Sequence, residues 1–461
     1  MGDFEVPAQA YYGANTMRAK NNFPISELSF PRGFIRALGL IKQQAALVNR
    51  ELGLLDPAIC DAIVRAAQDV IDGALDDQFI VDVFQTGSGT STNMNANEVI
   101  SNRAIELMGG ELGSRAPVHP NDHVNLGQSS NDVFPTAIQV AAAIALHDDL
   151  IPGLETLEQS LRAKSQEFWP VVKTGRTHLQ DATPIRLGQE FLGYAGQIDR
   201  AHRRAGHALA ALEDVPLGGT AVGTGAGTHE DFAKKVVARI ADATGIGFRE
   251  TDNHFSAQSN LDAVVFSSGV LKAAAVAMYK VASDIRLLGF GPRAGIAEIA
   301  VPAVQPGSSI MPGKVNPVII ESVTMVAAQV IGYDTTIAFC GAAGSLLELN
   351  VMMPIAAYDL LQSITLLANS ARNFATQCVD GITATENGPA LVERGLMLTT
   401  ALAPRIGYDR AAAIAKEAQA SGRTVREVAR EQSGLSDQEL DSVLDAEAMT
   451  RPGRDRAPAG G

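Results

Sequence analysis

Residues 307–317 read Gly-Ser-Ser-Ile-Met-Pro-Gly-Lys-Val-Asn-Pro and lead directly into an apolar segment. Two glycines and two prolines in these eleven residues exclude regular structure, because glycine admits positive φ whereas proline fixes φ and lacks an N–H donor. The stretch therefore predicts a mobile loop followed by a long buried helix. Its two serines, Lys314 and Asn316 are groups that can take a proton from carbon and hold the resulting anion. Considered alone, it also fits a surface loop with an incidental lysine.

Helical patterns dominate the chain on both sides of this loop. Asp56-Pro57 is an N-cap followed by a proline at the first helical position, which predicts a helix to about Ala74. The polar loop around Phe84 to Thr92 is expected to open another helix at about Asn93. Further helices are expected over about Ile35–Leu52, Pro135–Leu150 with Asn131 or Asp132 as its cap, Pro184–Leu212, Leu261–Leu288 and Val318–Ile331. An all-α fold follows.

Two features indicate how these helices pack. Leu187, Phe191, Tyr194 and Ile198 recur at spacings of four, three and four, which predicts a core stripe on one helix. The segments Leu261–Leu288 and Val318–Ile331 are apolar nearly all round. They should lie in the centre of a helix bundle or at subunit contacts.

We expect three domains from the length of 461 residues and from changes in pattern. Residues 1–128 form a mixed, mostly helical domain, and residues 129–385 a central bundle of long helices. Residues 386–461 form a small helical domain with a capping box at Ser436 to Glu439 and a disordered tail from Arg451. The glycine-rich loop 218–225 lacks the lysine of a phosphate-binding loop and is interpreted as a connector.

Composition restricts the classes of function. Lysine and arginine total 37 against 51 acidic residues, so the net charge of −14 gives no support to a nucleic-acid or anionic-membrane surface. Cys60, Cys340 and Cys378 are too few and too scattered for a disulfide framework or a CxxC metal site, and are expected in the core. The first ten residues lack the pattern of a signal peptide, and no apolar stretch reaches the length of a membrane span without a charge or break. A cytoplasmic protein is predicted.

Four segments together resemble the fumarase/aspartase superfamily, whose members eliminate a group β to a carboxylate and release fumarate. The segments are the 307–317 stretch, Gly87-Ser88-Gly89-Thr90, Gln128-Ser129-Ser130-Asn131-Asp132 and Gly175-Arg176-Thr177-His178. The resemblance extends from about Val6 to about Pro452 and is closest to class II fumarases, which use no metal or iron–sulfur cluster. It implies a three-domain fold whose central helices form one large bundle in an obligate homotetramer, with active sites shared between subunits.

The resemblance also implies roles for individual residues. Ser308 would abstract the proton, a role that a serine can fill only if backbone amides and a nearby cation stabilise its alkoxide. Lys314, Asn316 and Thr177 would hold the carboxylate that gains charge. The other contacts to the dicarboxylate would come from Ser88, Gly89, Thr90, Ser129, Ser130, Asn131, Ser309 and Val315.

The leaving hydroxyl needs a proton on the opposite face of the substrate. A histidine can deliver one near neutral pH, and His178 is the candidate. Glu321 lies on an otherwise apolar helix, where an unpaired carboxylate would be costly to bury, so we expect His178 to be its partner. Each residue alone would equally fit a core histidine or a solvated glutamate.

The segment His119-Pro120-Asn121-Asp122 resembles a second anion site of fumarases. The basic residue expected just before it is replaced by Ala116-Pro117, which weakens that assignment.

The family resemblance leaves alternatives open. Fumarate hydratase, converting fumarate and L-malate reversibly, is favoured by Thr86-Gly87-Ser88-Gly89-Thr90 and by the serine at position 130. Aspartate ammonia-lyase, with the same fold and ammonia as leaving group, is the nearest rival. A structural member without activity should have lost Ser308 or His178, and both are present. Argininosuccinate and adenylosuccinate lyases have loops that diverge from the 307–317 pattern.

Overall fold

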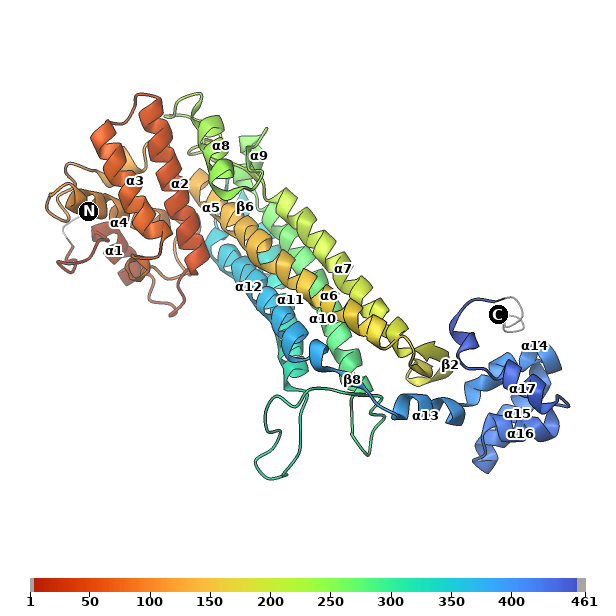
Figure 1. Ribbon diagram of the computed structural model, residues 1–461. Coiled ribbons are helices and arrows are strands. Elements are labelled where there is room, and N and C mark those ends of the chain that lie inside the picture. Colours follow the sequence, from red (N-terminus) through yellow and green to blue (C-terminus); the bar gives the residue numbers. More distant parts are fainter. Residues whose placement is uncertain (1–3, 454–461) are drawn as a thin grey trace. The chain divides into compact units, whose positions relative to one another are not determined.

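The computed structural model describes residues 4–453 of the chain and is built mainly of helices, which confirms the all-α prediction (Figure 1). Internal contacts divide it into two compact units. The first comprises residues 1–152, 201–275 and 326–369, and the second residues 153–200, 276–325 and 370–461. The division into three domains stays a prediction, and the tail beyond residue 453 lies outside the described residues.

The helices fall into three groups. Those contained in the first unit are α1 (Ala14–Asn22), α2 (Arg32–Glu51), α3 (Pro57–Ile71), α4 (Thr90–Leu107), α5 (Ser130–Ala145), α8 (Phe232–Thr244) and α9 (His254–Ser259). Those that contain a boundary between the units are α6 (Ile151–Glu167), α7 (Leu187–Ala211), α10 (Asp262–Leu288), α11 (Val318–Gly344) and α12 (Met353–Gln377). Those contained in the second unit are α13 (Asn387–Arg394), α14 (Ala403–Ile406), α15 (Tyr408–Ser421), α16 (Val425–Gln432) and α17 (Asp437–Val443). Short 3₁₀ or π-helical turns are η1 (Asp76–Gln78), η2 (Pro120–Val124), η3 (Leu146–Leu150), η4 (Val379–Gly381), η5 (Leu396–Ala401) and η6 (Ala448–Thr450).

The strands form small two-stranded sheets. Antiparallel pairs join β1 (Val172–Thr177) to β2 (Gln180–Arg186), β5 (Ile299–Ala300) to β8 (Thr383–Ala384), and β6 (Ser345–Leu346) to β7 (Leu349–Asn350); β3 (Asp214–Val215) pairs in parallel with β4 (Arg249–Glu250). The predicted helix from Pro184 was wrong at its start. Residues up to Arg186 belong to the hairpin, and helix α7 begins at Leu187.

Helix boundaries follow local capping chemistry. The Asp56 carboxylate accepts hydrogen bonds from the Ala58 and Ile59 amides, and Pro57 occupies the first helical position, as predicted for α3. This helix ends at Ile71 instead of Ala74, shortly before a glycine at positive φ. The capping box predicted at Ser436 is confirmed at the start of α17.

Two other predicted helix starts were wrong. Helix α4 begins at Thr90, three residues before the predicted Asn93. Helix α5 is capped by Ser129, and Asp132 instead completes the capping box by accepting from the Ser129 amide. Both helices therefore begin earlier in the sequence than hydrophobic periodicity alone indicates. Gly89 precedes the first residue of α4, and the Ser129 hydroxyl caps α5.

Each unit has its own apolar core. In the first unit the rings of Phe30, Phe34 and Phe134 contact one another, with centroids 4.4 to 5.8 Å apart. In the second unit the predicted stripe on α7 is buried throughout, and its Phe191 ring contacts Tyr194. Cys60, Cys340 and Cys378 are buried free thiols, so their core placement is confirmed.

Three helical stretches, 130–167, 262–288 and 318–344, are long and apolar enough to cross a membrane by length and composition. Each of these stretches contains charged residues, among them Asp148, Lys272 and Asp334, so they do not contradict the expectation, which concerned stretches without a charge or break. Helix α11 also runs to Gly344, beyond the predicted Ile331. Its Met325 and Phe339 side chains are 67% and 64% exposed in the single chain. This helix thus presents apolar surface that the chain itself does not cover.

Candidate active site

Three hydroxyl groups meet in the first unit where two helices begin. The Thr90 Oγ1 atom lies 2.7 Å from Ser88 Oγ and 2.7 Å from Ser130 Oγ. Thr90 is the first residue of α4 and Ser130 is the first residue of α5. The first turn of a helix has free N–H groups and a partial positive charge, so this hydroxyl cluster can bind an anion such as a carboxylate.

Close backbone packing holds the loop before α4. A Cβ atom on Gly87 would lie 1.8 Å from the carbonyl oxygen of Val351, and the Gly87 carbonyl accepts from the Met353 amide. Gly89 has φ of +72°, and a Cβ there would lie 2.1 Å from the ring of Phe134. Only glycine fits either position, so Ser88 is fixed between two close contacts and Thr90 directly follows the second.

The neighbouring side chains of the 128–132 segment are used within the chain. Ser129 Oγ accepts from the Asn131 amide at 3.2 Å, and Asn131 Nδ2 donates to the Ala221 carbonyl at 2.9 Å. The hydroxyl of Ser130 is therefore the group of this segment that joins the hydroxyl cluster. Substrate contacts by Ser129 and Asn131 stay predictions.

A buried lysine contacts two side chains at and just before the start of this segment. Lys42 is fully buried on α2, and its Nζ donates to Asn125 Oδ1 at 2.8 Å and to Gln128 Oε1 at 3.0 Å. Burial lowers the pKa of Lys42 to about 7, against an attraction to Asp132 that raises it. Lys42 could not be identified from the sequence, since a lysine on an amphipathic helix usually indicates a solvated face.

Asp132 is the second buried charge in this region. Its carboxylate accepts from the amides of Ser129, Gly218 and Thr220, each at 2.9 Å. Burial raises its pKa to about 6, although these hydrogen bonds act in the opposite direction. The 218–225 loop, interpreted from sequence as a connector, thus also anchors the start of α5. The spacing Ser129-x-x-Asp132 is a capping-box pattern that could have revealed this role.

In the second unit, Thr177 and His178 lie at the tip of the β1–β2 hairpin. His178 and Leu179 have φ of 55° and 60°, a left-handed conformation that is uncommon for residues other than glycine. Both side chains are exposed, Leu179 by 70%. The hairpin therefore holds the His178 imidazole outward on a tightly turned tip.

The 307–317 loop has no regular structure, as predicted, but it is internally bonded. Ser308 Oγ accepts from the amides of Ile310 at 3.2 Å and Met311 at 3.0 Å. The Gly307 amide donates to the Lys314 carbonyl at 2.8 Å, and Asn316 Nδ2 donates to the Gly307 carbonyl at 2.7 Å. The two amides on Ser308 are the arrangement that stabilises an alkoxide.

The charged groups of this region are open to solvent in the single chain. Lys314 is exposed, and within residues 4–453 its ammonium forms no ion pair. Glu321 lies in the first turn of α11 and is half-buried, so it avoids the burial cost that we inferred from the sequence. No hydrogen bond or ion pair joins Glu321 to His178 in the described part of one chain. Their pairing stays a prediction.

The candidate second anion site lies in the first unit. His119 Nδ1 accepts from the amides of Asn121 and Asp122 at 3.3 and 3.2 Å and so caps the turn η2, which begins at Pro120. Asp122 Oδ2 also lies 3.2 Å from His119 Nδ1. With this nitrogen used internally, only the other imidazole nitrogen of His119 is left for an anion.

The chain matches known families over most of its length. Residues 2–332 match the model described as "Lyase", and residues 398–451 match "Fumarase C C-terminus". Among curated proteins it is 52% identical over 452 residues to "Fumarate hydratase class II" of Rhizobium meliloti, covering 98% of this chain and 97% of the relative. It is 54% identical over 454 residues to the protein of the same name from Halobacterium salinarum, covering 98% and 96%.

A solved structure supports the same relationship. The recombinant class II fumarase from Schistosoma mansoni superposes with a TM-score of 0.95 at 39% identity, covering 97% of each chain. The two proteins therefore share the fold throughout the chain, including the regions that carry the candidate site residues.

Proposed function

The chain belongs to the class II fumarase family, and on that premise we propose that it is a fumarate hydratase, which interconverts fumarate and L-malate. The observation that carries this proposal is the pair of backbone amides that donate to Ser308 Oγ at 3.2 and 3.0 Å. A serine hydroxyl is too weak a base at neutral pH unless its alkoxide is stabilised, and these two amides provide that stabilisation.

In the direction of dehydration, Ser308 Oγ takes the proton from the carbon next to one carboxylate of L-malate. The electron pair moves into that carboxylate, which becomes a doubly charged aci-carboxylate. Lys314, Asn316 and Thr177 lie on the two segments that would surround it and would supply a cation and hydrogen-bond donors. Hydration of fumarate is the reverse sequence.

The second step expels the hydroxyl group from the neighbouring carbon. His178 donates a proton to it, so that water leaves and the double bond of fumarate forms. Glu321 from another protomer would orient the imidazole and stabilise its cation. The exposed position of His178 on the hairpin tip supports this role, because the ring can enter a site built partly by another chain.

The carboxylate that does not gain charge would be held by the hydroxyl cluster. The cluster supplies neutral donors at two helix N-termini, and such donors suit a carboxylate whose charge stays constant. The groups assigned to this binding are Ser88, Gly89, Thr90, Ser129, Ser130 and Asn131, with Ser309 and Val315 contributing from the loop.

We also propose that the chain works in the cytoplasm as a homotetramer with shared sites. Exposed apolar side chains on α10 and α11 support the assembly; they include Phe266, Val276, Tyr279, Met325 and Phe339. Burying such surface against other copies is more favourable than leaving it in water. The position of the catalytic candidates at exposed tips and loops supports the shared sites.

A paired assay tests the reaction. The purified protein is incubated with L-malate and, separately, with L-aspartate, and fumarate formation is followed by ultraviolet absorbance. We expect fumarate from L-malate at a much higher rate than from L-aspartate. Equal or reversed rates would refute the fumarate hydratase assignment and favour an aspartate ammonia-lyase.

A further inference from the structure

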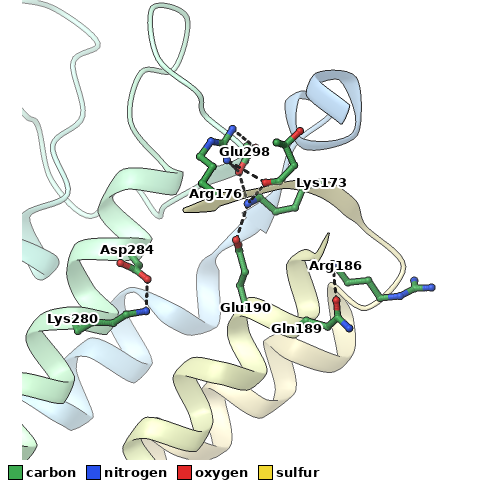
Figure 2. Close-up of polar contacts among 9 residues, drawn as sticks. Lys173, Arg176, Arg186, Gln189, Glu190, Lys280, Asp284 and Glu298 are labelled. Atoms are coloured by element: carbon green, nitrogen blue, oxygen red, sulfur yellow. Dashed lines mark hydrogen bonds and ion pairs between the residues drawn. The ribbon is translucent and has the colours of Figure 1, made fainter. Parts of the chain in front are cut away.

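A largely buried network of four charged side chains joins the β1–β2 hairpin to α7 and to Glu298 in the second unit (Figure 2). Arg176 donates through both terminal nitrogens to the two carboxylate oxygens of Glu298, at 3.0 and 2.9 Å. Lys173 Nζ lies 3.0 Å from Glu298 Oε2 and 2.8 Å from Glu190 Oε1. The side chains of Glu298 and Lys173 are 0% and 1% exposed.

Such a network is not expected to add much to the free energy of unfolding. Removing charges from water costs about as much free energy as their attraction returns, and apolar residues often serve a core better. One oxygen of the network, Glu190 Oε2, is buried without a hydrogen-bond partner among residues 4–453, and burial raises the pKa of Glu190. The network therefore points to a role in fixing geometry.

The network joins elements that are distant in the sequence. Lys173 and Arg176 belong to β1, and Glu190 belongs to α7. Glu298 precedes β5; its amide donates to the Leu288 carbonyl at the end of α10, and its carbonyl accepts from the Thr385 amide just after β8. Both the backbone and the side chain of Glu298 are thus fixed.

The same contacts lie next to two segments that carry catalytic candidates, the hairpin tip and the loop with Ser308. Arg176 is the residue immediately before Thr177 and His178, whose side chains are exposed. Glu298 lies just before β5, which leads into the irregular stretch that contains Ser308. The bidentate contact between Arg176 and Glu298 therefore lies immediately before the exposed hairpin tip, and also in the segment that leads to the catalytic loop.

We propose that Arg176 and Glu298 are positioning residues that hold the hairpin tip, with Thr177 and His178, in register with the start of the catalytic loop. This inference rests on the proposed function for its kinetic consequence. A guanidinium is required because its planar fork fixes the orientation of both partners, whereas an ammonium in the same place would leave the hairpin free to turn. Lys173 secures the second side of Glu298 and joins the pair to α7.

The test uses the full-length protein with Arg176→Lys, Glu298→Gln and the double variant. Arg186→Lys is the matched control, since Arg186 lies on the same hairpin but its ion pair is with Glu447, a 58% exposed carboxylate. We expect Arg176→Lys and Glu298→Gln each to lower kcat roughly 10- to 100-fold while KM changes less than about threefold. The double variant should lose little more than either single variant, because both remove one contact. The control should keep wild-type kcat.

Hydrogen–deuterium exchange provides a readout that does not depend on the reaction. Peptides covering residues 176–180 and 299–307 should exchange faster in Arg176→Lys and Glu298→Gln than in the wild type and in Arg186→Lys. Unchanged exchange in either folded variant would overturn the positioning role, whatever reaction the protein catalyses. Faster exchange without activity of the wild type towards L-malate would leave the positioning role intact and refute the proposed function instead. Exchange that rises equally across the second unit would show a merely structural role and would also overturn the proposal.

Discussion

Replacing the buried Lys42 by methionine should change how stability depends on pH. The pKa of Lys42 falls from 10.5 to about 7 on folding, because the ammonium is fully buried. Between these two values the unfolded chain binds more protons than the folded chain, so the stability contributed by this residue rises with pH through this window. Below pH 7 the folded protein carries the full cost of the buried charge.

The magnitude follows from the size of this shift. One pKa unit corresponds to about 1.4 kcal/mol, so the slope should approach but not exceed about 1.4 kcal/mol per pH unit. Over the window from about 7 to 10.5 the total is on the order of 5 kcal/mol as an upper bound. Methionine abolishes this slope. It also leaves Gln128 Oε1 without its donor, at a cost of about 1–3 kcal/mol that does not vary with pH, whereas Asn125 Oδ1 still accepts from the side chains of Asn93 and Asn97.

The assay is urea unfolding followed by circular dichroism at fixed protein concentration, at several pH values from 7 to 9.5. The control is Lys20→Met, which removes an exposed lysine from the same unit. The free energy of unfolding of the wild type should rise with pH relative to that of Lys42→Met. The difference in unfolding free energy between the wild type and Lys20→Met should stay constant. Parallel curves for wild type and Lys42→Met would show that the ammonium is not desolvated and would refute the reasoning.

Three further predictions concern the site. Ser308→Ala should lower kcat by roughly two to four powers of ten with a smaller change in KM, and Ser309→Ala should mainly raise KM; a Ser308→Ala enzyme that still exchanges the C3 proton of malate with solvent deuterium at the wild-type rate would assign the base elsewhere. Ser308→Ala and His178→Asn protomers, dissociated and reassembled together, should regain activity, and inactive assemblies shown by mass spectrometry to be hybrid would exclude sharing between these positions. Gly89→Ala should lower the thermal midpoint more than Gly109→Ala, because both glycines have positive φ but only a Cβ at Gly89 meets other atoms; equal shifts would contradict the steric argument.

Local patterns predicted much of the helical framework. Caps such as Asp56 and Ser436 act within three residues, and the α7 stripe from Leu187 to Ile198 repeats within a few turns. Such features depend on neighbours in the sequence, so the sequence alone shows them. The strand at Gln180–Arg186 was not predicted, because a proline within it was interpreted as the start of a helix.

The polar contacts that position the candidate site residues could not be predicted from local patterns. Lys42 meets its partner Asn125 across 83 residues, and Arg176 meets Glu298 across 122 residues. No periodicity within one element indicates which distant carboxylate or amide a buried cation will contact. The roles of Ser308 and His178 came from the family resemblance, and the structure adds the amides on Ser308 and the strained tip that carries His178.

The order of segments in the two units has a consequence for how the chain is made. Each boundary between the units falls inside a helix, at α6, α7, α10, α11 and α12 in turn. The first unit is therefore complete only when residue 369 has been synthesised, and the second only near the end of the chain. Domains usually fold as they emerge, from the N-terminus onward, whereas each unit here is completed only by segments that are synthesised late. No single cut in the gene would release either unit as one continuous fragment.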